Sequence, residues 1–222
     1  KNVAHGLLKV DLGVHVDGWL ADTAFSLDLE HNDLNERLIE ASKKALHNAT
    51  HIIKEGIVIK EVGKEIEKTI ESLGFSPIVN LSGHEMQEYE LHAGITIPNV
   101  DDSKNIILKK GLYAIEPFAS TGTGKVHDRR PSGIYMVIDE NTTRSPIARE
   151  VFEFIIEEYQ TLPFCSRWIV KKFGTKALFG LKQLEDNGSL HHFPQLVEQE
   201  GTIVSQAEDT VLIEKEKIIT TS

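Results

Sequence analysis

Two aspartates in one strand-like segment could bring their carboxylates together. Asp11 and Asp22 lie in residues 9–27, where apolar residues alternate with small or polar ones, a pattern typical of strands with one buried face. Asp17-Gly18 in the middle is a two-residue turn signal, so the segment should fold as a hairpin. Asp11 and Asp22 would then be diagonal neighbours on one sheet face, about 7–8 Å apart at the backbone.

The register of this hairpin divides its residues between two faces. If Val16 pairs with Trp19, Asp11 lies opposite Ala24 and Asp22 opposite Gly13. The other face is then apolar, and we expect it to be core: Val10, Leu12, Val14, Val16, Trp19, Ala21, Phe25 and Leu27. Two neighbouring carboxylates repel each other unless a cation lies between them. The alternative is a pair of solvated surface aspartates.

Three further residues of metal-binding type occur in unusual settings. His84 follows a glycine, which would let the backbone pass close to another group, although a surface loop histidine is the alternative. Glu116 interrupts an apolar strand, where an ionised side chain is costly unless it is paired or metal-bound. Glu208 stands in a similar strand beside Asp209, and only one of that pair can face a given site because strand neighbours point to opposite faces.

Together these residues predict a dinuclear metal site. Asp11, Asp22, His84, Glu116 and Glu208 supply four carboxylates, whose charge two divalent cations would balance. The set is rich in oxygen, with one imidazole and no thiolate, which favours Mn, Fe(II), Co or Zn over a structural zinc site. Two such ions about 3.5–4 Å apart can activate a water. The chemistry indicated is hydrolysis.

Helical and strand patterns surround these residues. Apolar stripes at helical spacing predict helices over 32–56 and 60–74. Short strands should follow, including 112–118 and 132–138. Ser145-Pro146 starts a run of helices, about 146–159, 164–173 and 175–186. We therefore predict catalytic-domain segments at 1–144 and 191–222, separated by a helical insertion at 145–190. The last segment should form strands over 201–207, 209–213 and 218–221, with a turn at 214–217.

Composition excludes several classes of protein. The chain has 222 residues and a net charge of −10, so nucleic acid and membranes are unsuitable partners. The insertion carries Arg167 and several lysines, for which a solvated helix face is favoured over nucleic-acid binding. Cys165 is the single cysteine, which excludes a disulfide framework and fits a reducing, cytoplasmic compartment.

Four stretches resemble successive motifs of the archaeal and eukaryotic type II methionine aminopeptidases: DLGVHVDGWLADTAF, NLSGHEMQEYELHAGITIPN, GLYAIEPFASTGTG and QAEDT. The resemblance implies an α/β pita-bread fold with a curved antiparallel sheet and a helical insertion. It implies two divalent metals on the five residues above, a substrate contact by His92, and proton transfer by Glu116. The implied reaction removes the initiator methionine from nascent polypeptides whose second residue is small. We expect a cytoplasmic monomer.

The chain departs from that family pattern in three places. Asp209 stands where the family usually has histidine, and KVHDRR follows the Gly-rich loop after Glu116. The family also has a segment before the hairpin that carries a second substrate histidine. If the segment between His5 and Asp11 is extended, the two residues lie about 20 Å apart, which is too far for His5 to replace that histidine. We therefore expect this chain to keep its metal site but to turn over poorly.

Two other functions remain alternatives. An Xaa-Pro dipeptidase shares the fold and the types of ligand, but its metal histidine is usually followed by glycine, whereas Glu85 follows His84 here. A non-catalytic pita-bread binding protein would have lost the ligand residues that this chain retains.

Overall fold

The computed structural model describes residues 3–215, 217–219 and 221. Their contacts divide the chain into two compact units. Unit 1 comprises Lys1–His127 and Glu198–Ser222, and unit 2 comprises Asp128–Val197. The predicted helical insertion, 145–190, lies within unit 2. The functional division of the chain at residues 144 and 190 stays a prediction.

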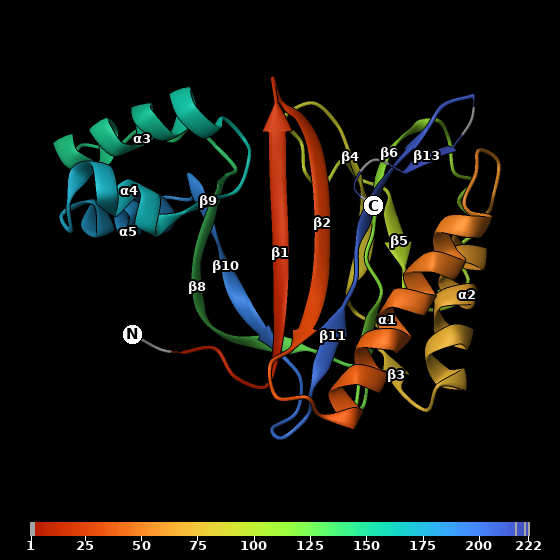
Figure 1. The fold of residues 1–222 in the computed structure, drawn as a ribbon. Helices are drawn as coiled ribbons and strands as arrows, with labels where there is room; N and C mark the ends of the chain where they lie inside the picture. Colours follow the sequence, from red (N-terminus) through yellow and green to blue (C-terminus); the bar gives the residue numbers. More distant parts are fainter. Residues whose placement is uncertain (1–2, 216, 220, 222) are drawn as a thin grey trace. The chain divides into compact units, whose positions relative to one another are not determined.

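An antiparallel hairpin of β1 (Leu7–Val16) and β2 (Trp19–Asp28) opens unit 1 (Figure 1). Its register is the predicted one, with Val16 opposite Trp19, Asp11 opposite Ala24 and Gly13 opposite Asp22. The turn has positive φ at both central residues, 49° at Asp17 and 85° at Gly18. Turns of that kind match the twist of the strands they join, which is why Asp-Gly is favoured there.

The apolar face of this hairpin is not core, so that prediction was wrong. Six large side chains are exposed there by 39–74%: Leu12, Val14, Val16, Trp19, Phe25 and Leu27. Alternation along a strand determines which face is apolar, but burial also requires another element to cover that face. No described element of unit 1 buries these side chains.

The larger sheet of unit 1 has five strands in the order β13-β12-β6-β4-β5. Its strands are Lys217–Ile219, Asp209–Ile213, Gly111–Ile115, Ser82–Met86 and Thr96–Pro98. A smaller sheet, β11-β7-β3, comprises Val204–Gln206, Phe118–Ser120 and Ser76–Pro77. The predicted strand 209–213 is confirmed, whereas only 204–206 of the predicted strand 201–207 is a strand. The predicted turn 214–217 and strand 218–221 include residues 216 and 220, which lie outside the described residues.

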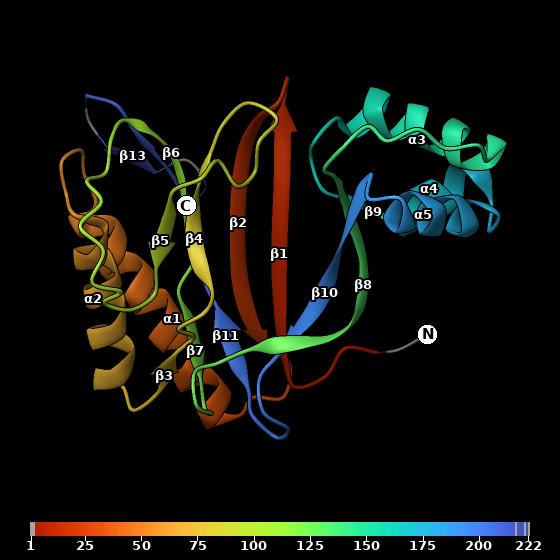
Figure 2. The same ribbon diagram turned by 180° about the vertical axis from the view of Figure 1, so that it is seen from behind.

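Two helices cover this sheet region and supply much of the core (Figures 1 and 2). They are α1 (Asp33–Ile52) and α2 (Ile59–Ser72), both shorter at the C-terminal end than the predicted helices. The side chain of Asn32 caps α1 by accepting hydrogen bonds from the backbone N–H groups of Leu34 and Asn35. Most of the apolar stripe of each helix is buried, as the predicted periodicity requires, although Leu34 in the first turn of α1 is exposed.

Unit 2 packs three helices with a three-stranded sheet. The helices are α3 (Pro146–Tyr159), α4 (Ser166–Phe173) and α5 (Ala177–Asp186). The sheet order is β10-β8-β9, over Leu190–Val197, His127–Val137 and Phe164–Cys165. Ser145 caps α3 as predicted. Residues 164–165 pair as a strand instead of starting the predicted helix, and β10 was not predicted. No helix in the described part of the chain has the length and apolar character needed to cross a membrane.

A buried glutamate ties two loops of unit 1 together. The carboxylate of Glu198 accepts hydrogen bonds from the backbone N–H groups of Gly124 and Gln199, both at 2.7 Å. It also accepts from the hydroxyls of Thr123 at 3.3 Å and Thr202 at 2.8 Å. Burial alone would raise the pKa of this carboxyl, but the hydrogen bonds from Thr202 and from backbone N–H groups lower it to about 2.

We predict that Glu198→Gln destabilises unit 1 at neutral pH, because hydrogen bonds to a buried charge each contribute roughly 1.5–3 kcal/mol. A lowered folded-state pKa means that the stabilisation is present above the unfolded value of 4.5 and is lost as the pH falls toward 2. Urea unfolding at pH 7 and pH 3 should therefore show a wild-type advantage that shrinks with acidity. Glu200→Gln, at an exposed position, is the control and should unfold like wild type at both pH values.

Candidate metal centre

Three of the predicted ligands come from one end of the five-stranded sheet. His84 on β4 lies opposite Ala114 on β6, and Glu116 follows two residues after Ala114. Asp209 pairs with Ile115, which places Glu208 opposite Glu116 just beyond the ladder. Because alternate residues of a strand share a face, His84, Glu116 and Glu208 project to the same side.

The hairpin joins this sheet through a β-bridge between Ala24 and Glu208. The Ala24 N–H donates to the Glu208 carbonyl at 3.3 Å, and the Glu208 N–H donates to the Ala24 carbonyl at 2.8 Å. Asp22 lies two residues before Ala24 on the same face of β2. The bridge therefore brings a hairpin carboxylate to the carboxylates of the sheet.

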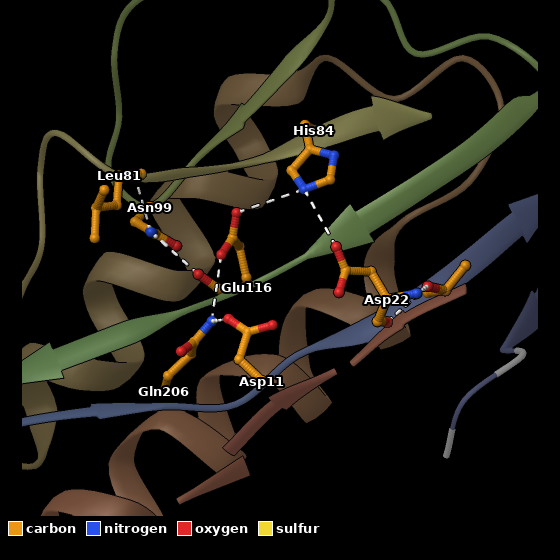
Figure 3. A network of polar contacts seen from close by, with 8 residues as sticks. Asp11, Asp22, Leu81, His84, Asn99, Glu116 and Gln206 are labelled. Atoms are coloured by element: carbon orange, nitrogen blue, oxygen red, sulfur yellow. Dashed lines mark hydrogen bonds and ion pairs between the residues drawn. The ribbon is translucent and has the colours of Figure 1, made fainter. Parts of the chain in front are cut away.

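The side chains converge on the imidazole of His84, as Figure 3 shows. The Nε2 atom of His84 is 3.9 Å from Oδ2 of Asp22 and 3.9 Å from Oε1 of Glu116. Asp22, His84 and Glu208 each offer one ligand atom, and these atoms lie within 4.8 Å of one another. All three residues are buried.

Asp11 reaches the same cluster through a glutamine. The side-chain amide of Gln206 donates hydrogen bonds to Oδ2 of Asp11 at 3.0 Å and to Oε2 of Glu116 at 3.4 Å. Figure 3 shows the amide between the two carboxylates. Of the ligand set, the side chain of Asp11 is the most exposed.

His92 lies beside the cluster, and Asp209 points away from it. The rings of His92 and His84 meet edge to face, with centroids 4.5 Å apart. The carboxylate of Asp209 accepts a hydrogen bond from the Thr221 hydroxyl at 3.2 Å. The expectation that only one of the neighbouring acids can face the site is therefore confirmed, and that acid is Glu208.

Burial and mutual repulsion disfavour charge on these carboxylates. Burial first, and then the charge of Asp11, raise the pKa of Asp22. Burial and the neighbouring carboxylates likewise raise the pKa values of Glu116 and Glu208. Burial, and then His92, lower the pKa of His84 to about 4, so its imidazole is neutral at pH 7.

These features fit a divalent cation. A neutral imidazole is the form that binds metal, and oxygen-rich sets with imidazole suit Mn, Fe, Co or Zn. The repulsion between the carboxylates would be relieved by a bound positive charge. The Nε2 atom of His84 faces the oxygens of Asp22 and Glu116, so it is the nitrogen placed to bind a cation.

A glycine allows His84 to reach its place. A Cβ atom on Gly83 would lie 2.2 Å from the carbonyl oxygen of Ala114, a separation that no side chain tolerates. The predicted close approach of the backbone at this glycine is therefore confirmed, and the group approached is β6 itself.

Sequence reasoning missed several residues that hold the site together. Gln206 lies within a motif that it identified, but it was not assigned a role. Asn99, also buried, donates hydrogen bonds to the carbonyls of Leu81 at 3.0 Å and Glu116 at 3.3 Å (Figure 3). Asn99 ends one of the motifs that carry the family resemblance and Gln206 begins another, and this placement was the available signal. Their partners are distant in sequence, so the pattern alone could not identify them.

The site and its frame together define an α/β metallohydrolase, and comparison with known proteins agrees. The sequence matches metallopeptidase family M24 over residues 3–215. It is 46% identical over 214 residues to the methionine aminopeptidase of Thermococcus onnurineus, a match that covers 94% of this chain and 71% of that protein.

Two solved structures share the fold. A thermophilic Arx1 structure aligns with a TM-score of 0.82 at 15% identity, covering 100% of this chain and 68% of that one. The methionine aminopeptidase of Thermotoga maritima aligns with a TM-score of 0.63 at 23% identity, covering 98% and 65%. The expected pita-bread fold is confirmed. The chain belongs to metallopeptidase family M24, and this membership implies the use of a divalent metal.

We predict that divalent metal binding near pH 7 releases protons, because the raised carboxylate pKa values leave protons on the metal-free cluster. Apparent affinity for Mn²⁺ should therefore rise with pH. Calorimetric titration in two buffers of different ionisation enthalpy measures the protons released. Glu208→Gln should weaken binding and reduce that release, whereas Glu88→Gln, at an exposed position, should change neither. Identical heats in both buffers would contradict the prediction.

Proposed function

We propose that this chain is a dinuclear metal-dependent aminopeptidase that removes the initiator methionine from polypeptides whose second residue is small. The observation that carries the proposal is the convergence of Asp22, His84 and Glu208, with Glu116 beside them, on one point between the hairpin and the sheet. Relatives named methionine aminopeptidase, at 46% identity or somewhat less, give the substrate class.

Five residues would hold the metal pair: Asp11, Asp22, His84, Glu116 and Glu208. Their four carboxylates match the charge of two divalent ions, which is the reason for proposing two ions rather than one. When bound, such a pair supplies an activated water and polarises the scissile carbonyl. Mn, Fe(II), Co and Zn all suit these ligands.

His92 is proposed to contact the substrate. Its ring stands edge-on to that of His84, close to the ligands but outside the group of atoms that converge. Burial lowers the pKa of His92, so the ring is neutral at pH 7. A neutral imidazole can donate a hydrogen bond to the scissile amide or accept one from it.

Glu116 is proposed to move the proton. One of its oxygens accepts from the Gln206 amide and the other faces His84, so the carboxylate is held from two sides within the cluster. A carboxylate fixed in this way can take a proton from the attacking water and return it to the leaving amine. We further propose that the enzyme acts on nascent chains in the cytoplasm, as a monomer.

The test of this function is hydrolysis of Met-Ala-Ser by the Mn²⁺- or Co²⁺-loaded chain, with Ala-Pro as the competing substrate. We expect release of methionine and negligible cleavage of Ala-Pro. Preferential cleavage of Ala-Pro would indicate the Xaa-Pro dipeptidase. Metal binding without cleavage of either peptide would indicate a binding protein on the same fold.

We predict that His92→Ala lowers kcat/KM for Met-Ala-Ser by roughly 10²–10⁴-fold, the usual contribution of a positioned acid–base group. Metal content, measured by elemental analysis, should stay at the wild-type level because His92 is not a proposed ligand. His51→Ala, on the exposed side of α1, serves as the control and should change neither quantity. A loss of bound metal in the His92 variant would instead make this residue a ligand.

A further inference from the structure

Side-chain hydroxyls take part in the contact, here called the seam, between the hairpin and the strands β11 and β12. Among the described residues of this seam, Ala24 and Glu208 alone make a direct backbone bridge. The residues that flank this bridge in the same register are Asp22 with Thr210 on one side and Ser26 with Gln206 on the other. All of these residues are buried, so their backbone polar groups need partners within the protein.

A hydroxyl replaces the backbone hydrogen bonds at each flanking pair. The Thr210 hydroxyl accepts from the Asp22 N–H and donates to the Asp22 carbonyl, both at 2.7 Å. The Ser26 hydroxyl accepts from the Gln206 N–H at 2.9 Å and donates to the Gln206 carbonyl at 2.8 Å. A hydroxyl can act as donor and acceptor at once, so each one satisfies both polar groups of the opposing residue.

Each of these hydroxyls acts on a residue whose side chain faces the carboxylate cluster. Thr210 fixes the backbone of Asp22, whose carboxylate lies 3.9 Å from His84. Ser26 fixes the backbone of Gln206, whose amide binds Asp11 and Glu116. β2 is therefore held one hydroxyl away from β12 on one side of the Ala24–Glu208 pair and from β11 on the other.

We propose that Thr210 and Ser26 are positioning residues of the metal centre: their hydroxyls act as spacers that set the separation of β2 from β11 and β12, and so the distances between the carboxylates. The inference rests on the proposed metal centre but not on the identity of the peptide substrate. Metal ligands must lie within about 0.2 Å of their preferred distances, so a change in this separation alters metal affinity before it alters the fold.

Thr210→Val tests the proposal most directly, because valine keeps the shape of threonine but leaves the N–H and carbonyl of Asp22 without the hydroxyl. We expect Co²⁺ affinity, measured by calorimetry on the full chain, to fall about 10–100-fold, the usual loss when a group that orients metal ligands is removed. The visible absorption bands of bound Co²⁺ should shift as its coordination changes. Thr210→Ser retains the hydroxyl and should restore affinity and spectrum.

Thr69→Val is the matched control, since it removes another buried threonine hydroxyl, which accepts a hydrogen bond from Asn48 at 3.0 Å in the contact between α1 and α2. It should lower thermal stability and leave Co²⁺ affinity unchanged. Ser26→Ala reports on the second spacer, and we expect a loss of affinity comparable to that of Thr210→Val. If Thr210→Val fails to fold, Ser26→Ala and Thr210→Ser still decide the question.

Wild-type Co²⁺ affinity in folded Thr210→Val, or in folded Ser26→Ala, would overturn the proposal. So would a Thr210→Ser variant as weak as Thr210→Val, because packing rather than the hydroxyl would then be responsible. These results are distinct from a failure of the proposed function, in which wild type binds Co²⁺ but does not cleave Met-Ala-Ser.

Discussion

The repulsion between closely placed carboxylates is the constraint on which the structure of unit 1 depends. Asp22, Glu116 and Glu208 lie in a largely buried site, where burial and the charges of neighbouring carboxylates raise their pKa values. Without a cation, and without strands that hold them in place, these carboxylates would separate or bind protons. The β-bridge at Ala24 and Glu208 and the rigid five-stranded sheet hold them together. Holding these carboxylates together costs stability, a cost that is common at functional sites and that a bound cation would offset.

Local parts of this arrangement could be predicted because they depend on neighbours in sequence. Alternation and the Asp-Gly turn define the hairpin register, and with it the face shared by Asp11 and Asp22. A carboxylate inside an apolar strand identified Glu116. The helical stripes identified α1 and α2. Each of these features is decided within about twenty residues, a range over which side-chain periodicity is informative.

The remaining features depend on pairings between distant segments. No local pattern shows that β4, β6 and β12 lie side by side, and the resemblance to a known family supplied that association. Ser26, Gln206 and Thr210 look like ordinary strand residues until the strands meet. The exposure of Trp19 and its apolar neighbours is the converse case. The sequence pattern defined a surface but could not show what would cover it.

The hydrogen bonds between Asp22 and Thr210 join residues 188 positions apart, and this separation affects how the protein is made. Contacts between distant residues form late, because loop closure must precede them. During synthesis the hairpin leaves the ribosome well before β11 and β12, so its carboxylates lack their partners until those strands emerge. The carboxylate cluster can therefore assemble only after residue 210 has emerged, so any chain released earlier lacks the hydrogen bonds between Asp22 and Thr210.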